Sequence, residues 1–188
     1  MGKGFRTDPY FPIAHSFPGG EAMNPRRRIR LGISACLLGE PVRYDATHRA
    51  SRVLLESLPP EVEPVPICPE MLAGLGVPRE PIQLAQDGKD LVLRGVESHR
   101  DVSAAMMAMV RDCRDLLMTL DGMILKSRSP SCGLADIPVF QAGEVVLSGS
   151  GYFVRQLLKL RPDLPVIEES ALAHQNDLTA FLEKIPSR

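Results

Sequence analysis

Three cysteines, Cys36, Cys68 and Cys132, are the residues of this sequence best placed to do chemistry. Each follows a short apolar run that is typical of a β-strand. Because the carboxyl ends of parallel strands meet at one edge of a sheet, we expect the three thiols to converge on one crevice. Soft thiolate ligands favour zinc, copper(I) or an iron–sulfur cluster over hard cations.

The spacing of the thiols helps to choose among these metal centres. A structural zinc site takes four ligands, commonly in closely spaced pairs, and these cysteines form no such pair. A cubane iron–sulfur cluster usually has four thiolate ligands, so a cluster held by three would keep one open iron as a Lewis acid. The thiols therefore favour a catalytic centre over structural zinc. The fourth cysteine, Cys113, lies on the apolar face of a predicted helix, and we expect it in the core.

Charged and hydroxyl side chains accompany each cysteine. Arg43 and Asp45 follow Cys36 on the same loop, and both could face the crevice. Glu70 comes two positions after Cys68, where a carboxylate could move protons to or from substrate or water. The loop before Cys132 is rich in serine and begins with a lysine, so it could offer hydroxyls and N–H groups to an anion.

The elements that must position these residues alternate between short strands and helices. Apolar runs predict strands at residues 29–35, 62–67, 122–126 and 166–167, the second of them edge-like because it contains two prolines. Apolar residues at helical spacing predict helices at residues 51–57, 102–120, 151–160 and 177–183. This alternation predicts an α/β fold, a single domain with a mostly parallel open sheet flanked by helices in a Rossmann-like three-layer arrangement.

The domain boundaries follow from shifts in composition. Residues 1–28 contain four prolines, a Gly-Gly pair and three consecutive arginines, which predict a flexible N-terminal extension. We expect the α/β domain to span residues 29–168. Residues 169–188 are predicted to be a C-terminal helical addition.

The overall composition excludes several classes of protein. The 188 residues are 44% hydrophobic, which suffices for an apolar core, and no apolar run approaches the roughly 20 residues that cross a bilayer. The net charge of −1 argues against nucleic acid as a partner. No secretory signal is evident, so we expect the thiols in a reducing cytoplasm, without disulfides. The sequence does not indicate an oligomeric state.

Three motifs resemble those of the thiouracil desulfidase family. They are SACLLG at residues 34–39 with RYD at 43–45, PICPE at 66–70, and LKSRSPSCG at 125–133. The resemblance covers residues 30–167. The chain departs from the family pattern at Ala46 and Ala73, where members often have glycine, and in the segment at residues 80–83.

The resemblance implies a [4Fe-4S] cluster on the three cysteines, with an unligated iron that takes the sulfur of 2-thiouracil. The products would be uracil and hydrogen sulfide, with no net redox change. Asp45 and Glu70 would act as acid-base groups and Ser131 as a further catalytic group that positions the substrate. The expected substrate-binding residues are Ser34, Arg43, Lys126 and Ser127.

Two other functions stay open at this point. The chain could be a cluster-binding sensor of oxygen or iron without catalysis, although acid-base residues beside the thiols argue against it. It could also be a sulfur-transfer enzyme that acts on tRNA. That function would call for a basic RNA-binding face and usually an ATP-binding loop, and the sequence has no P-loop pattern.

Overall fold

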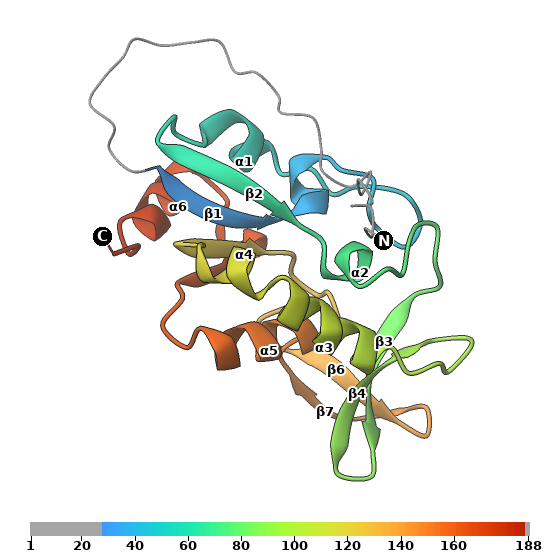
Figure 1. Cartoon of the computed structure of the whole chain (residues 1–188). Coiled ribbons are helices and arrows are strands. Elements are labelled where there is room, and N and C mark those ends of the chain that lie inside the picture. The colour runs from blue at the N-terminus through green and yellow to red at the C-terminus, as the bar shows by residue number, and fades with distance from the viewer. Residues whose placement is uncertain (1–27, 187–188) are drawn as a thin grey trace, which may run out of the picture.

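A parallel four-stranded sheet forms the centre of the molecule. The computed structural model describes residues 28–186, so the predicted extension lies outside the described residues apart from Arg28. The strand order is β2-β1-β5-β8 (Figure 1), and all three pairings are parallel. The strands are β1 (Ile29–Ser34), β2 (Val62–Ile67), β5 (Gly122–Leu125) and β8 (Val166–Glu168). All four lie where the apolar runs predicted them.

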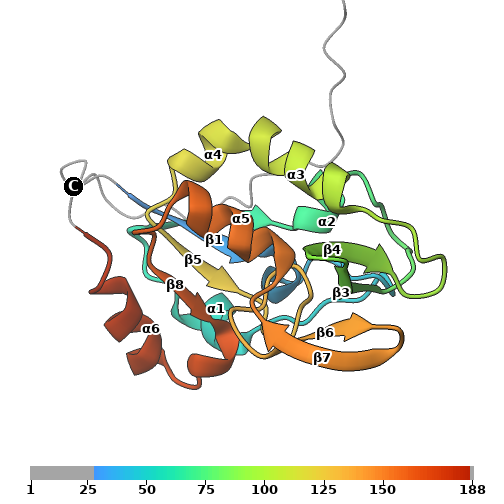
Figure 2. The same ribbon diagram turned by 90° about the horizontal axis from the view of Figure 1, so that it is seen from below.

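Helices cover both faces of this sheet, as Figure 2 shows. One face is covered by α3 (Ser103–Asp112), α4 (Arg114–Met118) and α5 (Tyr152–Leu160), and the other by α1 (Arg52–Ser57) and α6 (Gln175–Leu182). Three short helices follow strand ends, η1 (Ala35–Leu38) after β1, α2 (Pro69–Leu72) after β2 and η2 (Glu169–Ala171) after β8. The predicted three-layer α/β arrangement is therefore confirmed.

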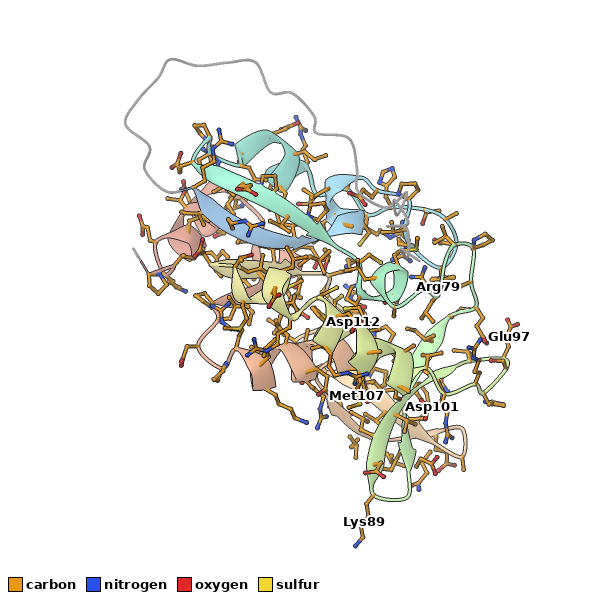
Figure 3. The ribbon with its side chains drawn as sticks, viewed as in Figure 1. Arg79, Lys89, Glu97, Asp101, Met107 and Asp112 are labelled. Atoms are coloured by element: carbon orange, nitrogen blue, oxygen red, sulfur yellow. The ribbon has the colours of Figure 1, made fainter. Side chains whose placement is uncertain are left out.

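A second, mixed sheet was not predicted from the sequence. Its strand order is β4-β3-β6-β7, with β3 (Ile82–Asp87), β4 (Asp90–Gly95), β6 (Ile137–Gln141) and β7 (Glu144–Gly149). Two hairpins build it, and Gly88 and Gly143 supply the positive φ of their turns. Lys89 lies at the tip of the first hairpin (Figure 3). The second sheet is inserted between elements of the first, because its hairpins follow α2 and β5 in the chain.

Two apolar cores lie on the two faces of the parallel sheet. Successive residues of a strand point to opposite faces, so Ile124 packs in one core while Met123 and Leu125 pack in the other. The core under α1 and α6 also contains Leu54 and Phe181. The C-terminal residues predicted to be an addition to the domain thus contribute to its core.

The structure divides one predicted helix in two and confirms one predicted edge strand. The helix predicted at residues 102–120 ends at Asp112 and restarts at Arg114, although neither proline nor glycine marks the break. The edge character predicted for residues 62–67 is confirmed, because β2 pairs with β1 alone within the described sheet. Pro64 and Pro66 suit this edge since they remove N–H groups from it. Among the described residues, no helix is long and apolar enough to cross a membrane.

Candidate metal and active site

A cavity of about 190 Å³ opens at the carboxyl ends of β1, β2 and β5, and all three candidate cysteines line it. Cys36 lies on η1 directly after β1, and Cys68 lies between β2 and α2. Cys132 lies on the loop that follows β5. The sheet therefore brings together thiols that are far apart in the sequence, as the strand-end argument predicts. Their assignment as ligands stays a prediction.

The three thiols are buried, with 8%, 6% and 4% of Cys36, Cys68 and Cys132 exposed. Burial, and after it the negative charge of Glu70, raises the pKa of Cys36 to about 11. The same two causes raise the pKa of Cys68 and of Cys132. Without a bound cation these thiols keep their protons at neutral pH, and a metal centre would displace those protons on binding.

The three thiols are soft donors of the kind that bind the irons of a cluster. Among the described residues, no three His, Cys, Asp or Glu side chains are grouped so that they could hold one metal ion. An iron–sulfur cubane does not require such a group, because each thiolate binds a different iron. The cavity also suits a cluster because four cationic side chains, against the two carboxylates Glu70 and Glu80, line it and can balance thiolate charge, namely Arg43, Arg79, Lys126 and Arg128. The donor set therefore fits a three-thiolate cluster.

Of the two candidate carboxylates, only Glu70 faces the cavity. It lies in the first turn of α2, is 8% exposed, and its Oε2 is 3.4 Å from Cys68 Sγ. Asp45 is exposed and does not line the cavity. Its carboxylate accepts hydrogen bonds from the hydroxyl (2.6 Å) and N–H (3.2 Å) of Thr47, which hold its pKa below the ordinary value. The acid-base assignment of Asp45 stays a prediction that this geometry does not favour.

The predicted substrate-binding residues line the cavity as a group: Ser34, Arg43, Lys126 and Ser127. Ser34 is 2% exposed, and its hydroxyl accepts the N–H of Lys126 at 2.9 Å, which ties the end of β1 to the end of β5. A hydrogen bond from this hydroxyl partly counteracts the rise in the pKa of Cys132. Ser127 is buried beside Lys126, whose Nζ is 3.1 Å from the Ser127 hydroxyl.

Ser131 lies apart from these residues. It is fully buried and does not line the cavity, and its hydroxyl has no hydrogen-bond partner among the described residues. Ser129, which was not selected from the sequence, does line the cavity. Its hydroxyl accepts the N–H groups of Ser131 (3.2 Å) and Cys132 (3.0 Å) and so fixes the turn that presents the third thiol. A serine three residues before a cysteine is the signal that could have identified it.

Arg79 is a second residue that the sequence did not single out for the site. It lies on the segment between α2 and β3 (Figure 3) and lines the cavity. Its Nη1 donates to the carbonyls of Gly76 (2.7 Å) and Val42 (3.0 Å), so it joins the loops that follow β1 and β2. Its charge also counteracts the rise in the Cys68 pKa.

The chain is similar to a known protein family, to a bacterial protein and to a solved structure. Residues 31–169 match the profile of a family described as 2-thiouracil desulfurase. YbbK of Bacillus subtilis (strain 168), a protein described as uncharacterized, is 30% identical over 152 residues, which are 74% of this chain and 95% of that protein. A solved structure of a [4Fe-4S]-dependent thiouracil desulfidase, TudS, has a TM-score of 0.61 and 30% identity. That match covers 83% of this chain and 99% of the solved one.

Proposed function

This chain belongs to the 2-thiouracil desulfurase family, and on that premise we propose that it is a [4Fe-4S]-dependent desulfidase for 2-thiouracil or a related small thiolated compound. The resemblance predicted from its three motifs is thereby confirmed. The reaction class is cleavage of a carbon–sulfur bond. Free thiols without disulfides fit a reducing cytoplasm, where we place the enzyme in this proposal.

The observation that carries the proposal is the set of three buried thiols on one cavity beside a buried carboxylate. Cys36, Cys68 and Cys132 would hold the cluster, and the cations that line the cavity would balance the charge of the thiolates. When bound by three thiolates, the cluster supplies a Lewis-acidic iron with an open position for a soft sulfur ligand.

The protein side chains would supply the rest of the chemistry. Glu70 is the acid-base group of the proposal, because its carboxylate is buried in the cavity wall and can take a proton from an attacking water. The water oxygen forms a bond to the carbon that bears sulfur, and the carbon–sulfur bond breaks. Sulfur leaves as hydrogen sulfide with both protons of that water, one of them returned by Glu70, and the product gains a carbonyl, so no electrons are gained or lost.

Cationic and hydroxyl side chains of the cavity wall would position a thiolated nucleobase. Lys126 and Arg43 offer N–H donors and positive charge to a carbonyl or a ring nitrogen. Ser127 offers a hydroxyl that can donate or accept. Donors held in fixed positions on a buried wall orient a small polar ring without a large interface.

Anaerobic reconstitution with iron and sulfide tests the proposal. Wild type should show cluster absorbance, close to four irons per chain, and hydrogen sulfide release from 2-thiouracil. Cys132→Ala should lose both the cluster and the activity. The matched control is Cys113→Ala, because Cys113 is the remaining cysteine and lies between α3 and α4, outside the cavity lining.

The outcomes separate the competing functions. A wild-type cluster without turnover of any thiolated nucleobase would overturn the substrate assignment and favour a sensor or a sulfur-transfer enzyme. Failure of the wild type to bind a cluster anaerobically would overturn the cofactor assignment. Equal loss of cluster in Cys113→Ala and Cys132→Ala would indicate a general loss of folding.

A further inference from the structure

Two consecutive glutamates at the end of β8 bind both ends of the loop that carries Cys132. Glu169, the first residue of η2, accepts the N–H of Ser127 at 2.6 Å and the hydroxyl of Ser127 at 2.8 Å. It also pairs with the ammonium of Lys126. Glu168 accepts the N–H of Leu134 at 2.7 Å. The Cys132 loop, residues 126–134, is therefore held at its start and at its end by neighbouring side chains.

The contacts at the start of the loop are largely shielded from water. The side chains of Lys126 and Glu169 are 19% and 16% exposed. Burial by itself would raise the pKa of Glu169, but hydrogen bonds from Lys126 and Ser127 hold it below its ordinary value. The carboxylate is therefore charged at neutral pH. Removing one partner of such a shielded pair leaves the other charge without compensation, so the pair acts as a unit.

The loop between these two anchors has a shape that a free loop would not keep. Arg128 has a φ of 56°, in the left-handed region that is unfavourable for residues other than glycine. Such a conformation persists where surrounding contacts impose it. Beyond Lys126 and Ser127, four more residues of the loop line the cavity, namely Arg128, Ser129, Pro130 and Cys132. Its anchors therefore determine where a thiol and several polar groups of the cavity lie.

We propose that Glu168 and Glu169 are positioning residues, a clamp that sets the Cys132 loop against the cavity. Glu169 orients Lys126 and Ser127, and Glu168 fixes the segment that follows Cys132. The effect of the clamp on catalysis rests on the proposed desulfidase function, whereas its effect on the loop does not. Glu169, predicted to begin a C-terminal addition, thus contacts two residues of the cavity wall, Lys126 and Ser127.

Thiol labelling of the metal-free, reduced protein tests the clamp directly. Cys132 is 4% exposed, so a maleimide reaches it only when the loop opens. In Glu169→Ala and in Glu168→Ala, loss of hydrogen bonds to a charged group should speed labelling of Cys132 by roughly ten- to a hundredfold. Cys36, which is also buried but lies outside the loop, should keep its wild-type rate, and peptide mass spectrometry distinguishes the two sites.

The matched control is Glu183→Ala, which removes an exposed carboxylate from the same C-terminal segment. An unchanged Cys132 rate in both clamp variants, relative to this control, would overturn the proposal. An equal rise at Cys36 and Cys132 would overturn it too, because that pattern indicates global loosening. If Glu169→Ala does not fold, Glu169→Gln tests the clamp instead, since the amide oxygen of glutamine can still accept a hydrogen bond from Ser127. This variant should speed labelling of Cys132 by a smaller factor, with Cys36 unchanged.

Steady-state kinetics of the reconstituted protein test the catalytic part. Glu169→Gln should raise KM for 2-thiouracil more than it lowers kcat, with iron per chain at the wild-type level, because Lys126 and Ser127 lose their charged anchor. Unchanged KM would overturn the orienting role of Glu169. If wild type shows no desulfidase activity, the labelling result still decides whether the clamp exists, so failure of the clamp and failure of the proposed function are distinguishable.

Discussion

The backbone of Gly151 lies against the carbonyl oxygen of Ser131 so closely that a Cβ at residue 151 would be 2.4 Å from that oxygen. This contact joins the start of α5 to the Cys132 loop. The N–H groups of Gly151 and Tyr152 donate to the carbonyls of Gly133 (2.7 Å) and Pro130 (2.8 Å). A helix start bonded to the loop on both sides of Cys132 helps to fix the third thiol in place.

We expect Gly151→Ala to displace the Cys132 loop and to lower cluster content. The added methyl group would meet backbone atoms, which cannot rotate away, so the free energy of unfolding should fall by about 1–3 kcal/mol. Iron per chain after reconstitution and thermal unfolding of the metal-free protein measure the two effects. Gly149→Ala is the control, because the nearest atom to its Cβ would be 3.7 Å away. Wild-type iron content in Gly151→Ala would contradict the role given to this contact.

Replacing Glu70 by glutamine should slow sulfide release without removing the cluster. The amide cannot take a proton from water, and loss of a general base costs about a hundredfold or more in rate. Sulfide release and iron content are measured on the same sample. Asp45→Asn should lower the rate far less, because Asp45 is exposed, lies outside the cavity lining and reaches the site only through an ion pair with Arg43 at 3.6 Å. A large loss in Asp45→Asn with full activity in Glu70→Gln would reverse the assignment.

The position of the thiols was predictable because it depends on a rule of parallel sheets. Each cysteine follows an apolar run, and carboxyl strand ends share one edge whatever the details of packing. The orientation of Asp45 was not predictable in this way. A turn follows it, in which Ala46 has a φ of 57°, and Asp45 bonds to Thr47 rather than facing the cavity. The number of residues between Asp45 and Cys36 does not reveal that a turn directs the Asp45 side chain away from the cavity.

Contacts from distant segments account for the other omissions. Glu169 is 37 residues from Cys132 and reaches its loop only because β8 pairs with β5. Each hairpin of the second sheet has a glycine in its two-residue turn, Gly88-Lys89 and Ala142-Gly143, yet the parallel pairing of β3 with β6 joins segments that are distant in the sequence. The local pattern of apolar residues identifies helices and strands. Contacts between segments that are distant in the sequence become visible only in the tertiary structure.

Ala46→Gly should stabilise the protein. Ala46 holds a left-handed conformation that glycine adopts without strain, so we expect the free energy of unfolding to rise by about 1 kcal/mol. Urea unfolding of the metal-free protein measures this change. Ala73 is the matched control, because it too stands where family members often have glycine but has a φ of −78°. Ala73→Gly should lower the free energy of unfolding by about 0.5–1 kcal/mol, and a gain there equal to that of Ala46→Gly would contradict the strain argument.

Glu80 should make stability depend on pH on the acid side. Hydrogen bonds from the hydroxyl and N–H of Ser98, together with the N–H of Glu97, hold its pKa below the ordinary value of 4.5. A carboxyl whose pKa is lowered by folding stabilises the folded state above its ordinary pKa, and this contribution is lost as the pH falls through the folded value. The difference in Tm between wild type and Glu80→Gln should therefore be largest near pH 7 and shrink below pH 4.5. Glu56→Gln is the control, since its exposed carboxylate forms a solvent-screened pair with Arg52 one helical turn away, and it should give a small difference at every pH. A Glu80→Gln difference that stays constant from pH 7 to pH 3 would contradict the assignment.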